Sequence, residues 1–224
     1  MTEHKKGSYT EDCRYKIGQC AEHFIPWFKK GQPTQLTPEW FIDLGPGCAC
    51  EHEDALKAWP GVKLLGLEPS DVGFRAANTR WPKDGKLLKV AAWDSDGEAV
   101  LYYPEDLLHS TLFVDGQRNY DNDTTNVLGT KDLVTCPTRS LDSLDLEYGP
   151  FNNVALWMDI EGAERRALKG AASLLARRAI IAVNIEVRPP YAGEIAETLG
   201  MGGLKKVYQY FVSEHVRDEV WVKR

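Results

Sequence analysis

The stretch FIDLGPG at residues 41–47 decides the fold of this chain, together with LLGLEP at residues 64–69. Each stretch is an apolar run of strand length that reaches an acidic residue, Asp43 or Glu68, and a segment long enough for a helix separates them. The glycines of the first stretch let the backbone approach a ligand closely, and a carboxylate after the second can bind both hydroxyls of a ribose. The spacing therefore predicts a strand–helix–strand unit that binds a cofactor of the adenosine type.

The composition indicates one globular domain without a membrane or nucleic-acid partner. The chain has 224 residues and a formal net charge of −6, which gives no general attraction for phosphate backbones. No apolar stretch approaches the length of a membrane span, and the opening MTEHKK lacks the hydrophobic core of a signal peptide. We therefore expect a cytoplasmic protein that binds neither membrane nor nucleic acid.

The cysteines are expected to be free thiols. Their number, five, is odd, and the chain is large enough to fold without disulfides. The CACEH segment at residues 48–52 has too short a spacing for a structural zinc site, and no second pair of ligands follows it. No metal site is predicted there.

Helix and strand patterns alternate along the chain, which predicts an α/β fold with a mostly parallel sheet. Apolar residues at helical spacing in residues 10–30 predict an N-terminal helix, so we divide the chain into a helical extension, 1–36, and a main domain, 37–224. The last two strands follow each other closely and suggest an antiparallel edge. The expected strands are residues 40–44, 63–67, 87–93, 98–103, 134–137, 154–160, 179–187, 205–212 and 219–223. The expected helices are residues 50–58, 74–81, 140–148, 163–169 and 194–199.

Two further segments carry specific expectations. The turn sequence DSDG at residues 94–97 predicts a hairpin between the strands that flank it. Residues 104–132 are polar and long for a loop in a compact domain, which is typical of a lid or a binding loop.

The segment WMDIEGAE at residues 157–164 is a second dense group of acidic residues. Asp159 closes a buried strand, so its carboxylate should face the same edge of the sheet as Asp43. There it would bind the amino group of the cofactor, act as a general base or help to hold a divalent cation. The alternative is a helix N-cap, a role open to Asp159, Glu161 and Glu164 alike.

Two other residues are candidates for the chemistry. Glu186 ends the strand at residues 180–187 and would contact the substrate, unless it only pairs with Arg188. His109 is a candidate base in the polar loop, although a lone histidine is more often a surface residue. The sequence has no nucleophile elbow, P-loop or paired metal-binding histidines, so hydrolysis and phosphoryl transfer are not predicted.

Taken together, these motifs resemble those of the FkbM-type methyltransferases. The resemblance extends over residues 40–187 and rests on these segments: DLGPG at 43–47, EP at 68–69, SLDSL at 140–144, MDIEGAE at 158–164 and LKGA at 168–171. It implies a Rossmann-like methyltransferase fold with a mostly parallel seven-stranded sheet and an antiparallel edge strand. It also implies S-adenosylmethionine as the cofactor and a hydroxyl of a sugar or another small polar molecule as the acceptor.

The resemblance assigns roles to individual residues. The cofactor-binding residues that it implies are Asp43, Gly45, Gly47, Glu68, Ala92 and Asp159. The first three would line the methionine end, Glu68 the ribose and Ala92 the adenine, with Asp159 at the reacting end. The chain departs from the family at Trp157, where lysine is usual, and at Ala49, which is nearest to the third glycine.

The expected reaction is a methyl transfer with catalytic roles for Asp159, Glu186 and His109. Because the sulfonium methyl group is already activated, the protein has to align an acceptor oxygen with it and exclude water. A carboxylate would take the acceptor proton, or a divalent cation would lower the pKa of the hydroxyl; the sequence leaves both open. The alternatives are a nicotinamide-dependent oxidoreductase or epimerase on a similar sheet, and a non-catalytic cofactor-binding protein.

Overall fold

The structure is a computed structural model, and it describes residues 20–31, 36–47, 51–103, 111–114, 117–118, 132–211 and 216–223. His109, Cys13, Cys48, Cys50 and most of the polar segment at 104–132 lie outside the described residues, so the expectations for them stay predictions. The division into residues 1–36 and 37–224 also stays a prediction.

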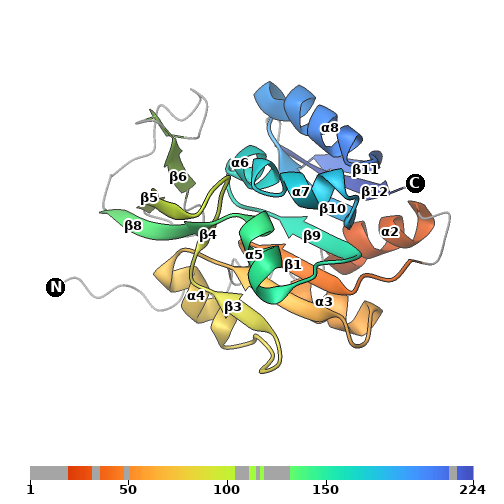
Figure 1. The fold of residues 1–224 in the computed structure, drawn as a ribbon, viewed down its shortest axis with the longest axis horizontal. Coiled ribbons are helices and arrows are strands. Elements are labelled where there is room, and N and C mark those ends of the chain that lie inside the picture. Colours follow the sequence, from red (N-terminus) through yellow and green to blue (C-terminus); the bar gives the residue numbers. More distant parts are fainter. Residues whose placement is uncertain are drawn as a thin grey trace.

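The centre of the fold is a seven-stranded sheet in the order β11-β12-β10-β9-β1-β2-β3 (Figure 1). Its strands are β1 (Trp40–Leu44), β2 (Lys63–Leu67), β3 (Lys86–Leu88), β9 (Val154–Met158), β10 (Ile180–Val187), β11 (Leu204–Phe211) and β12 (Arg217–Lys223). All pairings are parallel except those of β12, which runs antiparallel to β10 and to the edge strand β11. The predicted α/β fold, with a mostly parallel sheet and antiparallel pairing at one edge, is confirmed.

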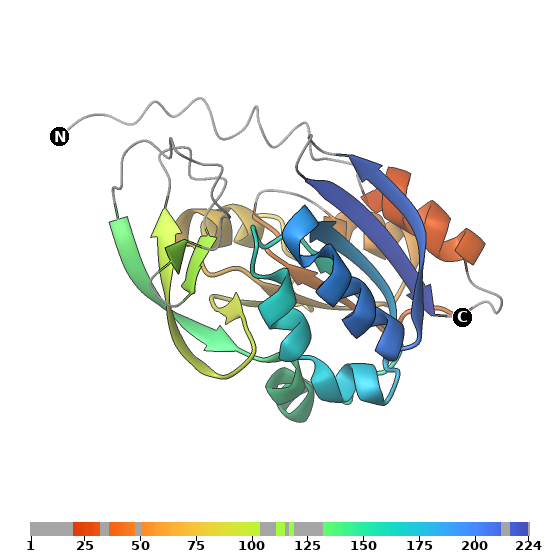
Figure 2. The same cartoon turned by 90° about the horizontal axis from the view of Figure 1, so that it is seen from above.

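Helices cover both faces of this sheet (Figure 2). One face packs against η1 (Cys20–Phe24), α2 (Ile25–Gly31), α3 (Glu51–Ala58) and α4 (Asp71–Asn78). The other face packs against α5 (Leu141–Tyr148), α6 (Glu164–Lys169), α7 (Ala172–Ala176) and α8 (Ala192–Met201), with the short 3-10 turn η2 (Pro189–Tyr191) before α8. Every residue of β1 and of β9 is buried, as expected for strands that are covered on both sides.

The N-terminal helical segment belongs to the core of the fold. Phe24 and Phe28 are buried and pack edge-on against Trp59, and Phe24 also contacts Trp157 of β9. The predicted N-terminal helix is confirmed where the structure describes it, from residue 20 to Gly31. Within the described residues, no helix is both long enough and apolar enough to cross a bilayer.

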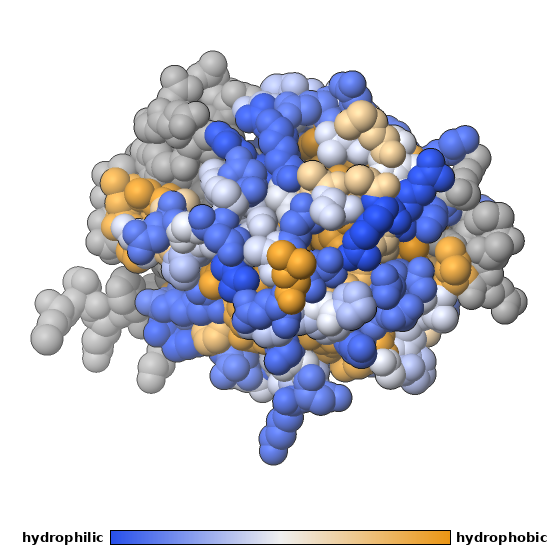
Figure 3. Space-filling model, in the orientation of Figure 1, coloured by the Kyte–Doolittle hydropathy of each residue, from blue (hydrophilic) through white to orange (hydrophobic). Residues whose placement is uncertain are grey.

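A second, smaller sheet has the strand order β4-β8-β5-β6-β7. Its strands are β4 (Ala91–Ala92), β5 (Gly97–Tyr103), β6 (Thr111–Val114), β7 (Gln117–Arg118) and β8 (Asp132–Arg139). Apolar side chains are exposed on β5 and β8 of this sheet, at Val100, Leu133 and Val134 (Figure 3).

The predicted hairpin around residues 94–97 is wrong. The expected strand 87–93 divides between the two sheets as β3 and β4, and β5 pairs antiparallel with β8 instead. The reason is a long-range contact: Asp96 accepts hydrogen bonds from the backbone N–H of Ser140 (2.9 Å) and the hydroxyl of Ser143 (2.6 Å). This contact fixes the turn against the start of α5 and directs β5 along β8.

Serine side chains cap the first turn of two helices and set where each helix begins. The expected helix 74–81 begins earlier, at Asp71, because the Ser70 hydroxyl accepts a hydrogen bond from the N–H of Gly73 (2.9 Å) and caps it. The predicted cap of α5 by Ser140 is confirmed, with its hydroxyl accepting from the N–H of Ser143 (3.1 Å).

Candidate functional site

The glycine turn after β1 sits at the carboxyl edge of the large sheet, against the ends of both neighbouring strands. The N–H of Gly45 donates to the carbonyl of Leu67 (2.9 Å), and the N–H of Asp159 donates to the carbonyl of Leu44 (3.1 Å). Gly45 has a φ of +81°, and a Cβ there would lie 2.1 Å from the carbonyl oxygen of Asp159. The close contact and the left-handed backbone restrict position 45 to glycine. The two backbone hydrogen bonds bring the ends of β1, β2 and β9 together.

Glu68 ties the end of β2 to this turn. One of its carboxylate oxygens accepts from the N–H of Gly47 (3.1 Å) and the other from the N–H of Ser70 (2.9 Å). Burial raises the pKa of Glu68, while the hydrogen bonds from Ser70 and Gly47 act against that rise. The position matches the one predicted for a ribose-binding carboxylate, and each oxygen keeps a further lone pair for a ligand hydroxyl.

Gly73 is a member of this group that the sequence analysis missed. A Cβ at this position would lie 2.6 Å from the carboxyl carbon of Glu68. The signal was present in the sequence as a serine followed three residues later by glycine, which is a helix cap directly after the acidic residue.

Asp43 is the most deeply buried acidic side chain of the site. Its exposed fraction is 0 %, and neither carboxylate oxygen has a hydrogen-bond partner among the described residues. Burial raises its pKa well above the ordinary range, and the negative charges of Asp159 and Glu68 raise it further. A buried carboxyl group in this state matches a ligand that brings a donor or a positive charge.

Asp159 stands between two groups of side chains. Its charge raises the pKa of Asp43 and Glu68 on one side, and that of Glu186 and Tyr210 on the other. We call Asp43 and Glu68 the cofactor-side pair. The structure thus brings Asp43, Glu68, Asp159 and Glu186 together, as the sequence predicted.

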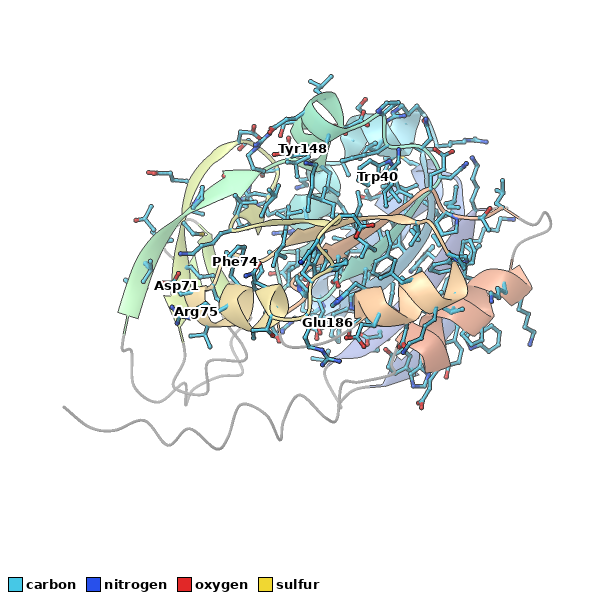
Figure 4. The ribbon with its side chains drawn as sticks, turned by 90° about the horizontal axis from the view of Figure 1, so that it is seen from below. Trp40, Asp71, Phe74, Arg75, Tyr148 and Glu186 are labelled. Carbon is cyan, nitrogen blue, oxygen red and sulfur yellow. The ribbon has the colours of Figure 1, made fainter. Side chains whose placement is uncertain are left out.

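Glu186 begins a row of polar residues that crosses the antiparallel part of the sheet. It is the register partner of Asp218 on β12, and Asp218 is the partner of Tyr210 on β11, so the three side chains emerge on one face. We call Glu186, Asp218 and Tyr210 the acceptor-side row. Seen from below, Glu186 lies between α4 and α3, on the face of the sheet that these helices cover (Figure 4).

The electrostatic environment of this row is strongly acidic. Burial raises the pKa of Glu186 to about 9, with further contributions from the charges of Asp159, Glu161 and Glu164, and the guanidinium of Arg188 lowers it. Burial also raises the pKa of Tyr210, which the charges of Asp218 and Asp159 raise further. Burial therefore favours the protonated form of Glu186 and the neutral hydroxyl of Tyr210.

Asp218 and Tyr210 were not predicted. Their sequence surroundings, YQYF at residues 208–211 and VRDEV at residues 216–220, resemble ordinary edge strands. Only the pairing of three strands places them beside Glu186. The ring of His23 on η1 stacks on the ring of Tyr210, with centroids 4.2 Å apart.

The two acidic residues that follow Asp159 have different contacts: Glu164 binds backbone N–H groups, and Glu161 forms an ion pair. The carboxylate of Glu164 accepts from the N–H groups of Ile160 (3.1 Å) and Gly162 (3.3 Å), and burial raises its pKa to about 7. The N-cap role considered in the sequence analysis is not what Glu164 does: the N-cap of α6 is Ala163, and Glu164 stabilises the turn before the helix. Glu161 forms an ion pair with Arg188 (3.2 Å), which also binds Glu186 (3.0 Å).

Ala92 and Trp157 lie in the hydrophobic core. Ala92 is in β4 and packs in the cluster that includes the helices α5 to α8, so its predicted contact with adenine remains a prediction. Trp157 is buried against Phe24, with ring centroids 5.9 Å apart and a steep interplanar angle. The family position usually held by lysine is therefore a core aromatic residue here.

Metal-binding residues are not grouped in the described part of the chain. No three His, Cys, Asp or Glu side chains in it are arranged to hold a metal ion. Cys136 is a buried free thiol whose pKa burial raises to about 11, which makes it unreactive. His52 contacts the carbonyl of Arg80 (3.3 Å), and its ring packs at a tilted angle against that of Trp81, so it supports the fold away from the acidic group.

Comparison with known families identifies the family of this chain. A model of the methyltransferase FkbM domain matches residues 48–212, which is most of the chain. The chain belongs to the FkbM methyltransferase family. The structure is also similar to the crystal structure of methyltransferase FkbM from Methylobacillus flagellatus KT, with a TM-score of 0.54 and 13% sequence identity. The match covers 87% of this chain and 46% of that one, so the chain spans about half the length of its structural relative.

More distant structures belong to other methyltransferases. The N-terminal domain of human METTL16 in complex with SAH is 14% identical, with a TM-score of 0.46 over 89% of this chain and 68% of that one. A putative RNA methyltransferase from Pyrococcus horikoshii is 9% identical, with a TM-score of 0.41 over 82% and 74%. A comparison with curated proteins finds no match. The comparisons do not test the predicted absence of a nucleic-acid partner.

Proposed function

We propose that this member of the FkbM methyltransferase family transfers a methyl group from S-adenosylmethionine to a hydroxyl of a sugar or another small polar molecule. The observation that carries the proposal is the position of Asp159, whose charge acts on the cofactor-side pair and on the acceptor-side row alike. A methyltransferase has to bring the methyl carbon of the donor into contact with the acceptor atom, so its two binding sites have to adjoin.

The cofactor side fits S-adenosylmethionine on three features. Asp43 is a buried carboxyl group without a hydrogen-bond partner among the described residues, which matches the positively charged methionine end of the donor. Glu68 matches the ribose hydroxyls. Gly45 has backbone geometry that only glycine adopts readily, and it keeps the turn free of side-chain atoms.

In this mechanism the bound donor supplies an activated methyl group on a positively charged sulfur. The residues of the chain place and deprotonate the acceptor. Asp159 stands at the reacting end and accepts the hydroxyl proton, and Tyr210 and Asp218 orient the acceptor. Alignment accounts for most of the rate enhancement, and proton transfer contributes about 10²–10⁴-fold.

The acidic surroundings favour an acceptor without negative charge. Phosphate groups would approach Glu161 and Asp218, and the nearby cation Arg188 is already bound by Glu161 and Glu186. Repulsion of this kind selects against RNA and sugar phosphates. A cytoplasmic site of action remains a prediction from the sequence, and so does a requirement for a divalent cation.

The proposal is tested first by binding and then by transfer. Calorimetric titration should show binding of S-adenosylhomocysteine and none of NAD; the reverse result would favour the nicotinamide-dependent alternative. Transfer is then measured by mass spectrometry on hydroxylated small molecules and on RNA, with and without EDTA. Methylation of RNA alone would overturn the proposed acceptor class. Binding of S-adenosylhomocysteine without methyl transfer to any acceptor would favour the non-catalytic alternative.

A further inference from the structure

The acidic side chains of the site form one cluster that extends across four strands. We call Asp43, Asp159, Glu186 and Asp218 the carboxyl cluster. Asp43 is at the end of β1 and Asp159 directly follows its neighbour β9; Glu186 and Asp218 are register partners on the next two strands. Register partners in a sheet lie side by side on the same face. Asp43 pairs in register with Trp157, two residues before Asp159, and the charge of Asp159 acts on Asp43, so the cluster reaches from the cofactor side to the acceptor side.

Few positive charges balance this cluster. The other ionisable groups that face it from the described elements are His23 on η1, Glu51 on α3, Glu68 after β2, Glu161 and Glu164 near the start of α6, Arg188 after β10 and Tyr210 on β11. Of these, Arg188 has the only permanent positive charge, and Glu161 and Glu186 bind it. Within the cluster, this arrangement raises the pKa of Asp43 and of Glu186, which favours their protonated forms.

Two members of the cluster support this interpretation. Asp43 is completely buried, and neither of its oxygens has a hydrogen-bond partner among the described residues, an environment that favours the protonated carboxyl group. Burial and the neighbouring charges raise the pKa of Glu186 to about 9. A cation that enters such a cluster stabilises the charged form of the carboxyl groups and expels a proton.

We propose that the carboxyl cluster binds the methyl donor in exchange for a proton and recovers a proton from the acceptor hydroxyl during transfer, with Glu186 as the residue that holds it. This inference rests on the proposed function, and it adds a property that methyl transfer does not require. Many arrangements of residues can bind the donor without any change in protonation.

The charges and atoms balance at each stage. On donor binding, a protonated carboxyl group releases its proton to solvent, and the carboxylate then lies near the positively charged sulfur. During transfer the bond between the methyl carbon and sulfur breaks, and its electron pair stays on sulfur. A bond forms between the acceptor oxygen and the methyl carbon, and the hydroxyl proton moves to the carboxylate. After transfer the sulfur is neutral and the carboxyl group carries the proton, so the net charge of the site is unchanged.

Calorimetry of the unmodified full chain tests the proposal without knowledge of the acceptor. S-adenosylmethionine and S-adenosylhomocysteine differ by the methyl group and the charge on sulfur, so they form a matched pair. Each is titrated at pH 7 in phosphate and in Tris buffer, whose ionisation enthalpies differ, and the difference in heat gives the number of protons released. We expect close to one proton more for the donor than for the product. Equal proton release by the two ligands would overturn the proposal.

The Glu186→Gln variant identifies the residue, and Glu147→Gln, an exposed acid on α5, is the matched control. We expect the donor to release no extra proton in Glu186→Gln, with the affinity for S-adenosylhomocysteine changed less than threefold, and normal release in Glu147→Gln. Unchanged proton release in Glu186→Gln would contradict the assignment to Glu186. If that variant did not fold, the comparison of donor and product in the unmodified chain would still decide the exchange. Absence of binding by both ligands would refute the proposed function, whereas equal release with binding would refute only this inference.

Discussion

The cofactor-side pair and the acceptor-side row are built in different ways. Asp43 and Glu68 lie on adjacent strands joined by one helix, and Glu68 accepts hydrogen bonds from backbone N–H groups within the same strand–helix–strand unit. Glu186, Asp218 and Tyr210 come from three strands, and their alignment depends on antiparallel pairing at the edge of the sheet. The first group is fixed by short segments with particular residues, and the second by long-range pairing.

The two sides should therefore differ in how many substitutions they tolerate. The cofactor side depends on glycines and backbone contacts that tolerate few substitutions. The acceptor side uses side chains on a sheet surface, where one residue can be replaced while the strand pairing is kept. We expect the cofactor side to be rigid in its requirements and the acceptor side to be adjustable.

The strongest test of the rigid side is Gly45→Ala. A Cβ at this position meets the carbonyl of Asp159, and the left-handed backbone disfavours alanine as well. We expect a loss of about 3 kcal/mol or more in the free energy of unfolding, from overpacking and backbone strain together. Urea denaturation measures it.

Gly61→Ala is the matched control, since its φ is +86° and nothing lies within 4 Å of the added Cβ. It should cost only the backbone term, about 1–2 kcal/mol. Equal losses in the two variants would mean that the contact with Asp159 is unimportant.

Asp159→Asn tests the junction between the two groups. The isosteric change should leave the fold and the affinity for S-adenosylhomocysteine nearly unchanged, because the backbone N–H of residue 159 still bonds to Leu44. We expect the rate of methyl transfer to fall by about 10²-fold or more, the scale of a lost proton acceptor. Turnover like that of the unmodified protein, measured by release of S-adenosylhomocysteine, would remove Asp159 from the mechanism.

Glu68→Ala tests the ribose assignment. Loss of the carboxylate should weaken binding of S-adenosylhomocysteine by about 1–3 kcal/mol, because the ribose hydroxyls lose their partner. Glu147→Ala is the control, since Glu147 is an exposed acid on α5 that lies outside the site. Calorimetry that finds equal affinity in Glu68→Ala and the unmodified chain would refute the assignment.

Smaller effects are expected on the adjustable side. Tyr210→Phe and Asp218→Asn each remove one polar interaction with the acceptor, so KM for an acceptor should rise by roughly 3- to 10-fold, the scale of a single hydrogen bond. The Kd of S-adenosylhomocysteine should stay within about twofold, since neither residue belongs to the cofactor-side pair. A rise in that Kd without a change in KM would contradict the assignment of Tyr210 and Asp218 to the acceptor side.

The pH dependence of stability distinguishes the two sides further. The pKa of Glu186 is raised from its ordinary 4.5 to about 9 in the folded chain. Below pH 4.5 Glu186 is protonated in both the folded and unfolded states, and its contribution to stability is then complete. As pH rises toward 9 the unfolded state loses its proton first, so the free energy of unfolding falls.

Glu186→Gln should flatten this fall, and Glu147→Gln should not. Thermal unfolding measured between pH 5 and 9 checks this difference. Identical pH profiles for Glu186→Gln and the unmodified chain would contradict the raised pKa.

The sequence predicted the cofactor side better than the acceptor side for a physical reason. Asp43, Gly45 and Glu68 belong to short motifs whose spacing reflects one local unit, and the structure places them together at one edge of the sheet. Asp159 was also predicted, because the end of a buried strand has a defined position in a parallel sheet. The family resemblance added the identity of the cofactor.

The remaining features depend on contacts that the sequence does not reveal locally. Asp218 and Tyr210 become neighbours of Glu186 only through the order and register of β10, β12 and β11. The hairpin predicted at residues 94–97 was wrong because Asp96 bonds to the start of α5, which lies more than forty residues away. Trp157 was interpreted as a departure from a functional position, but packing against Phe24 explains it.

The most direct test of the account is a crystal structure of the protein with bound S-adenosylhomocysteine. We expect the ribose hydroxyls within hydrogen-bonding distance of Glu68, the methionine end beside Asp43, and the sulfur facing Asp159. A nucleoside bound elsewhere, with Asp43 and Glu68 making no contact to it, would contradict the account.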